Sequence, residues 1–165
     1  NRGRSETAMS YRVRTVTPDD IPALIELCAE HAAYEKASYS SEGKAEKIQQ
    51  ALFSQRFYAW VIEGTEGLVG YATATLEFST WDADYFLHMD CLYLKESVRG
   101  QGLGEKLVCE VAKLAKEKAC VNVQWQTPDW NKRAMKFYER LGASSKNKVR
   151  FFLNQQTISR LSGEV

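Results

Sequence analysis

The chain lacks the features that mark several large classes of protein. Its 165 residues carry 22 Lys and Arg against 21 Asp and Glu, so a net charge of +1 provides no electrostatic basis for binding nucleic acid or a membrane surface. No apolar run approaches the length of a transmembrane helix, and the N-terminus lacks the apolar segment of a signal peptide. Residues 1–9 are polar and patternless. We therefore expect a disordered leader or cloning remnant there, followed by one cytoplasmic domain over 10–165.

The sequence also lacks closely paired cysteines, and this spacing excludes the usual metal-binding patterns. The four cysteines are Cys28, Cys91, Cys109 and Cys120. Each lies in an apolar segment, as is typical of buried, reduced thiols in a cytosolic protein. The sequence therefore predicts neither a disulfide framework nor a metal site.

Apolar periodicity divides the chain into strands and helices. The predicted strands cover 10–16, 57–62, 68–78, 85–94, 121–125 and 148–153. The predicted helices cover 41–55, 103–118, 130–141 and a first segment that starts at the Thr17-Pro18-Asp19-Asp20 cap and extends toward Tyr34. The expected order is β-α-α-β-β-β-α-β-α-β, which is an α/β (α+β) chain.

A glycine loop follows the strand over 85–94 and opens the helix over 103–118. It reads Arg99-Gly100-Gln101-Gly102-Leu103-Gly104. Glycine lets the backbone come close to a ligand and turn its N–H groups toward it, and a helix N-terminus adds partial positive charge. Arg99 supplies a permanent charge. The loop therefore predicts a site for a cofactor that carries a pyrophosphate.

Three phosphate motifs compete for this loop. A nucleotide-binding P-loop requires Gly-Lys-Ser/Thr, but Glu105 and Lys106 follow Gly104. A dinucleotide fingerprint requires its third glycine where Glu105 stands. The pattern Arg/Gln-x-x-Gly-x-Gly/Ala is satisfied by Arg99, Gly102 and Gly104, and it resembles the coenzyme A loop of the GCN5-related N-acetyltransferases (the GNAT superfamily).

A second segment resembles the other GNAT signature. Residues 130–143 read Trp-Asn-Lys-Arg-Ala-Met-Lys-Phe-Tyr-Glu-Arg-Leu-Gly-Ala, and helical spacing sets Ala134, Phe137 and Tyr138 on one side. Asn131 stands at the helix start as a cap or cofactor contact. In the family this helix lies over the pantetheine arm with the tyrosine hydroxyl near the thioester sulfur. An ordinary half-buried core tyrosine is the alternative for Tyr138, and the family spacing of the two motifs favours the catalytic interpretation.

Within the superfamily, several segments resemble the diamine (spermidine/spermine) acetyltransferase group. They are Tyr34-Glu35, Phe57-Tyr58, Ser79-Thr80-Trp81 and Asp129-Trp130-Asn131. The group's strand signature aligns with residues 89–94, where Asp90 replaces a glutamate and Cys91 replaces an aspartate. One acid of the acceptor site is kept and one is lost, so the resemblance still implies an amine acceptor.

The resemblance covers almost the whole chain, from Tyr11 to Leu153. It implies the GNAT acyl-CoA N-acyltransferase fold, with a mixed, mostly antiparallel central sheet flanked by about four helices. It also implies acetyl-CoA as donor, no metal, and direct attack by a primary amine of a small molecule, such as a diamine or polyamine. An amino acid, an aminoglycoside or a protein amine are alternative acceptors, and a non-catalytic acyl-CoA-binding regulator is an alternative of another class. Many relatives are dimers, so a homodimer is possible.

The resemblance also assigns roles to residues. Tyr138 is the expected general acid toward the departing thiolate, and a peptide N–H near Leu92 is the expected oxyanion donor. An alkylammonium holds its proton about 9 kcal/mol more strongly than an ordinary carboxylate does, so Asp90 would attract the amine and pass its proton to water. A relay from His88 to Asp90 is a further option, because the two residues share a strand face.

The cofactor and acceptor residues complete these expectations. The expected cofactor residues are Leu92, Tyr93, Leu94, Arg99, Gly100, Gln101, Gly102, Leu103, Gly104, Glu105, Asn131, Arg133, Ala134 and Tyr138. The expected acceptor residues are Glu35, Asp82 and Asp90. Glu35, Asp82 and Asp84 would form an acidic mouth for a cationic acceptor, or they would be solvated charges with no such role.

Overall fold

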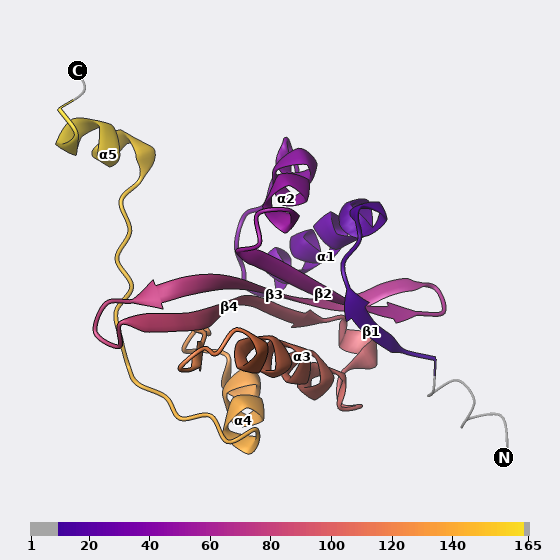
Figure 1. Cartoon of the computed structure of the whole chain (residues 1–165). Coiled ribbons are helices and arrows are strands. Elements are labelled where there is room, and N and C mark those ends of the chain that lie inside the picture. The colour runs from indigo at the N-terminus through magenta and orange to yellow at the C-terminus, as the bar shows by residue number, and fades with distance from the viewer. Residues whose placement is uncertain (1–9, 164–165) are drawn as a thin grey trace, which may run out of the picture. The chain divides into compact units, whose positions relative to one another are not determined.

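The computed structural model describes residues 10–163, and Figure 1 shows their path. In this range five strands form one sheet in chain order: β1 (Arg12–Thr15), β2 (Phe57–Gly64), β3 (Gly67–Ser79), β4 (Asp84–Leu94) and β5 (Val123–Gln124). Neighbouring strands are antiparallel except β4 and β5, which run parallel. The predicted mixed, mostly antiparallel sheet is confirmed.

The helices lie between and after the strands. They are α1 (Ile21–Tyr34), α2 (Lys44–Leu52), α3 (Leu103–Glu117), α4 (Lys132–Arg140) and α5 (Gln155–Leu161), with short 3-10 turns η2 (Pro18–Asp20) and η3 (Glu96–Val98). The chain divides into two compact units, one ending at Trp130 and the other starting at Asn131. In the first unit α1 and α2 cover one face of the sheet and α3 covers the other (Figure 1).

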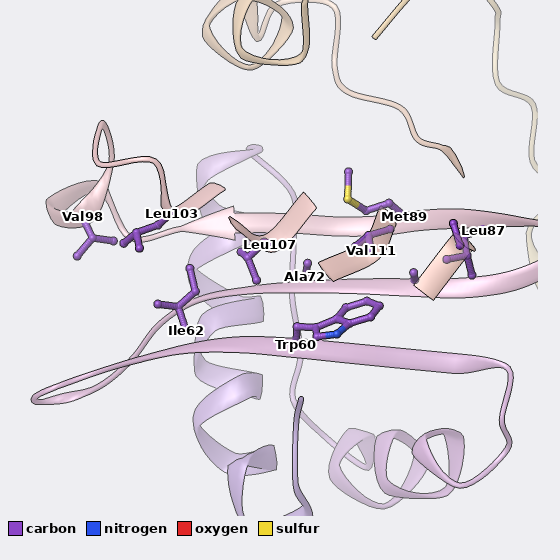
Figure 2. Packing of buried hydrophobic residues seen from close by; sticks show 11 residues of the cluster. Trp60, Ile62, Ala72, Leu87, Met89, Val98, Leu103, Leu107 and Val111 are labelled. Carbon is purple, nitrogen blue, oxygen red and sulfur yellow. The ribbon is translucent and has the colours of Figure 1, made fainter. Parts of the chain in front are cut away.

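Apolar side chains fill both interfaces of the first unit. Figure 2 shows the larger cluster, in which Trp60, Leu87 and Met89 from the strands pack with Leu107 and Val111 of α3. The smaller cluster lies on the α1 side, with Leu24, Leu27, Val61 and Tyr71 buried. The i, i+4 spacing of the buried α3 residues matches the apolar stripe expected from the sequence.

The predicted sixth strand over 148–153 is wrong. Residues 143–154 adopt no regular structure, and Val149, Phe151 and Phe152 are 80–89% exposed. Alternating β-rich residues favour a strand, but a strand also requires a partner ladder, which local pattern does not supply. Helix α5 then follows, capped by the Asn154 side chain accepting from the Thr157 N–H at 2.9 Å. Asn154 is a residue type that favours helix N-caps, but no helix was predicted after it from the sequence.

The four cysteines are unpaired, but their burial differs from the expectation. Cys28, Cys91 and Cys120 are partly buried, whereas Cys109 is exposed because it lies off the Leu107–Val111 face of α3. Over residues 10–163, His, Cys, Asp and Glu side chains form no group of three or more that could hold a metal ion. In the same range no helix is long and apolar enough to cross a membrane.

An ion pair joins β1 to the start of α1. The Asp20 carboxylate accepts hydrogen bonds from Arg14 Nη1 at 2.7 Å, from Arg14 Nη2 at 2.9 Å and from the Thr17 N–H at 2.8 Å. The Arg14 hydrogen bonds, assisted by those of Thr17, lower the pKa of Asp20 to about 2. Because this pKa is lower in the folded chain than in the unfolded chain, the carboxylate stabilises the fold at neutral pH. That stabilisation is lost as the pH falls from about 4 to 2.

We expect Asp20→Asn to lower the free energy of unfolding by about 2 kcal/mol at neutral pH, because the half-buried Arg14 guanidinium then loses the charged partner of its Nη1 and Nη2 and keeps only Glu63 at its Nε. The variant should also lose part of the pH dependence of stability between about pH 4 and pH 2. Urea denaturation over a pH series measures both effects. Asp19→Asn, at the exposed neighbouring position, is the matched control. Equal losses in the two variants would contradict the prediction.

Candidate functional site

The site is organised by a β-bulge at Asp90 in β4. Cys91 stands opposite Thr73 and Met89 opposite Ala74, so Asp90 is an extra residue without a partner on β3. The bulge changes which side chains face which layer. Before it, Leu87 and Met89 pack toward α3, whereas after it Cys91 and Tyr93 pack toward α1.

Beyond His88, β4 presents an open backbone edge within the described part of the first unit. There β5 pairs with β4 only at Leu87 and His88. The Lys95 N–H donates to the Val69 carbonyl on β3 at 2.8 Å, and peptide groups alternate along a strand. The peptide groups of Leu94 and Leu92 therefore point away from β3 toward this open edge. Both residues were expected to bind the cofactor through their backbone.

The glycine loop takes the backbone conformation that glycine permits. Gly100 has φ +80° and Gly102 has φ +79°, in the left-handed region, and a Cβ at either position would meet no atom within 4 Å. Conformation, not lack of space, therefore requires glycine here. Gly102 is the N-cap of α3 and has no side chain to cap the first N–H groups. The first turn of α3 therefore offers amide donors and partial positive charge to an anion, as expected from the sequence.

Arg99 is anchored to the end of β4. Its Nε donates to the Leu94 carbonyl at 3.0 Å, and its guanidinium carbon lies 4.7 Å from the Tyr34 ring centre and 5.7 Å from that of Tyr93. The sequence predicted Arg99 as an anion partner and gave no sign of these contacts. They fix the start of the glycine loop against α1 and β4.

The bulge presents the Asp90 carboxylate on the α1 side of the sheet. Asp90 is exposed, and the Cys91 thiol contacts its Oδ2 at 3.7 Å. Burial, together with the charge of Asp90, raises the pKa of Cys91 to about 12, so this thiol stays protonated. His88 lies on the same side, as expected, but its recorded partner is Glu77 at 3.9 Å, and the structure shows no His88–Asp90 contact.

A polar cluster that was not predicted from the sequence lies beside Asp90. His31 on α1 contacts Glu35 through Nε2 at 2.6 Å and the Tyr71 hydroxyl through Nδ1 at 2.7 Å. Its ring also stacks on Tyr93, with centroids 5.1 Å apart and planes 21° apart. The only sequence signal was the i, i+4 spacing of His31 and Glu35 on a helix.

The expected acidic mouth is not assembled. Asp82 lies in the turn between β3 and β4, next to the Ser79–Asp84 pair, whereas Glu35 belongs to the cluster beside Tyr93. Nine residues separate Asp84 from Tyr93, which corresponds to roughly 30 Å along an extended strand. The structure therefore groups Glu35 with Asp90 and separates both from Asp82, whose position favours the solvated-charge interpretation.

The remaining predicted residues belong to the second unit. Asn131 is the N-cap of α4, and its side chain accepts from the Ala134 N–H at 3.2 Å. The predicted cap is confirmed. Arg133 and Tyr138 lie within α4, and the Tyr138 ring centre is 5.4 Å from that of Phe137.

Comparison with known proteins identifies the class. The model of the acetyltransferase (GNAT) family matches residues 24–143, and the chain belongs to this family. It is 32% identical over 130 residues to a thialysine N-epsilon-acetyltransferase from Caenorhabditis elegans, covering 79% of this chain and 81% of that protein. A protein of the same name from Bos taurus is 31% identical over 141 residues, covering 79% and 82%.

Solved structures show the same fold. An aminoglycoside acetyltransferase from a soil metagenomic sample aligns with a TM-score of 0.74 at 21% identity, covering 88% of this chain and 95% of that one. An aminoglycoside N-acetyltransferase in complex with CoA also has a TM-score of 0.74, at 15% identity and with the same coverage. Family and relatives together make the protein an acyl-CoA-dependent N-acetyltransferase that acts on an amine.

Two glycines at helix N-caps allow a test of the loop. Gly43 caps α2 with φ +71° and, like Gly102, has no atom within 4 Å of an added Cβ. We expect Gly102→Ala and Gly43→Ala each to cost about 1 kcal/mol of stability, because alanine is strained in this conformation. Only Gly102→Ala should also reduce the rise in Tm that CoA produces, measured by differential scanning fluorimetry. An undiminished CoA shift in Gly102→Ala would exclude the loop from cofactor binding.

Proposed function

We propose that the protein transfers the acetyl group of acetyl-CoA to a primary amine of a small molecule that carries a second cationic group. Diamines, polyamines and lysine analogues belong to this class. The observation that carries the proposal is the bulge at Asp90. It presents a carboxylate to one side of β4 and, two residues later, an outward peptide group at Leu92. The relatives named thialysine N-epsilon-acetyltransferase support an amine acceptor of this size.

The first unit supplies two kinds of contact for the cofactor. Amide donors of the glycine loop, from Gly100 to Gly104, would hold the pyrophosphate. The outward peptide groups of Leu92 and Leu94 would hydrogen-bond the pantetheine amides as a strand does. The peptide N–H near Leu92 would also polarise the thioester carbonyl. Acetyl-CoA supplies the activated acetyl group, and the chain's residues place it against the amine.

Asp90 would attract the ammonium form of the acceptor. An alkylammonium must lose its proton before it attacks, and an ordinary carboxylate is too weak a base to keep that proton. Asp90 is exposed, so water can take the proton onward from its carboxylate. Glu35 lies on the same side of the sheet, in the His31 cluster, and would hold a second positive charge on the acceptor. Two acids on one side therefore favour a dication over a simple alkylamine.

Tyr138 would donate a proton to the departing CoA thiolate. This role comes from the match of residues 131–143 to the family signature, and a tyrosine hydroxyl is ordinarily protonated at neutral pH.

The experiment that tests the function is an amine panel. The protein is incubated with acetyl-CoA and, in turn, putrescine, spermidine, thialysine, an aminoglycoside and a simple alkylamine. Free CoA thiol is then measured. We expect thiol release with the diamines or thialysine to exceed release with the alkylamine. CoA binding without thiol release on any amine would instead indicate a regulatory acyl-CoA-binding protein.

In the same assay Tyr138→Phe should lower kcat by roughly 100-fold or more, because the variant lacks the donor hydroxyl. The CoA-induced rise in Tm should stay nearly intact, since the ring remains. Tyr85→Phe, at a half-exposed position in β4, is the matched control. Unchanged turnover in Tyr138→Phe would remove this residue from the mechanism.

We also propose that the protein is a homodimer, because the side chains of Val149, Phe151 and Phe152 are 80–89% exposed among the described residues. Exposed apolar groups of this kind mark interfaces. Light scattering over a concentration series should give twice the chain mass for the wild type and a shift toward the monomer for the double variant Phe151→Ser, Phe152→Ser. A monomeric wild type would contradict this prediction.

A further inference from the structure

His31 has a partner at each ring nitrogen and an aromatic ring against its face. Its side chain is only 14% exposed and has a partner in each direction: Glu35 at Nε2, the Tyr71 hydroxyl at Nδ1, and the Tyr93 ring against its face. Tyr71 is fully buried, and burial raises its pKa far above the ordinary value. The Tyr71 hydroxyl therefore keeps its proton and can donate it to Nδ1.

These partners select the neutral imidazole with its proton on Nε2. In that form Nδ1 accepts from Tyr71 and the Nε2–H donates to Glu35. Burial lowers the pKa of His31, even though the charges of Glu35 and Asp90 oppose this, and Arg99 assists it. At neutral pH the pair of His31 and Glu35 therefore carries one negative charge.

The position of Glu35 explains what His31 contributes. Glu35 is the C-cap residue of α1, where the partial negative charge of the helix end disfavours a carboxylate. A neutral N–H donor from the preceding turn offsets this repulsion and fixes the carboxylate without cancelling its charge. A lysine or arginine at position 31 would hold Glu35 equally well, but it would neutralise it.

We propose that His31 is a positioning residue of the acceptor site, which holds the Glu35 carboxylate oriented toward the second cationic group of the acceptor. The proposal rests on the proposed function and deepens it by naming how that group is recognised. Protonation of His31 in acid neutralises the pair, so acceptors with two charges bind more weakly as the pH falls. The groups that act on His31 are Glu35 at the C-cap of α1, Tyr71 from β3, Asp90 and Tyr93 from β4, and Arg99, while Cys28 and Cys91 interact with Tyr71.

The test compares putrescine with butylamine, which lacks the second amine, in His31→Gln, Glu35→Gln and the double variant. We expect each single variant to raise the KM for putrescine about fivefold, with kcat and the KM for butylamine nearly unchanged. The double variant should match Glu35→Gln alone, because His31 acts through Glu35. Glu30→Gln, which removes another α1 acid whose partner is Lys95 at 3.4 Å, is the matched control.

The pH profile gives a readout that a structural role would not move. In the wild type, the ratio of the putrescine KM to the butylamine KM should rise as the pH falls through the pKa of His31. In His31→Gln it should stay flat. The chain has only two histidines, so proton NMR of the wild type and of His88→Gln assigns the His31 signal, whose pKa should lie below the ordinary value of about 6.5.

The outcomes distinguish failure of the proposed function from failure of the role of His31. A wild type that acetylates no amine defeats the proposed function and this proposal with it. An active wild type whose variants raise both KM values equally, or whose single effects multiply in the double variant, overturns the role of His31 alone. If His31→Gln does not fold, Glu35→Gln and the wild-type pH profile decide: a flat wild-type ratio overturns the proposal.

Discussion

The β-bulge at Asp90 sets which side chains and peptide groups of β4 face each side of the strand. Without the bulge at Asp90, the alternation of the strand would continue, and the peptide groups of Leu92 and Leu94 would turn toward β3. The side chains of Cys91 and Tyr93 would also turn from α1 toward α3. The bulge thus places the Asp90 carboxylate, the outward peptide group of Leu92 and the Tyr93 ring within four residues of one strand. Acyl transfer from a thioester to an amine requires the donor and the acceptor to be held close together.

Tyr93 packs against residues from both the acceptor part and the cofactor part of the candidate site. His31 stacks on its ring, with centroids 5.1 Å apart, and the Arg99 guanidinium lies 5.7 Å from its centre. The residues that would hold a cationic acceptor and the start of the loop that would hold the anionic cofactor therefore pack against one tyrosine. Arg99 also bonds the Leu94 carbonyl, which ties the loop to the strand edge. The proposed acceptor and cofactor residues would therefore be held on one common element of the fold.

Periodicity and caps predicted most of the architecture. The order of the first five strands, a helical start at Thr17-Pro18 and the Asn131 cap of α4 are confirmed, because each depends on residues that are close in sequence. The helical start takes the form of the 3-10 turn η2, which leads into α1 at Ile21. The strand over 148–153 failed because a ladder partner is a non-local requirement. The sequence left open whether Glu35 and Asp82 form an acidic mouth, because their spacing along the chain does not determine their distance across the sheet.

The glycine loop and the segment over 130–143 could be recognised from the sequence alone, and they identified the class of cofactor and reaction. Those features are local, because a turn conformation, a helix cap or a run of amide donors depends on neighbouring residues. The arrangement of the proposed acceptor residues could not be recognised from local sequence in this way. Asp90 became a bulge residue only through its register with β3, and His31 met Tyr71 and Tyr93 only once α1 packed on the sheet. Register and packing bring together residues that are 40 or more positions apart, as with His31 and Tyr71, and no pattern within one segment encodes such a contact.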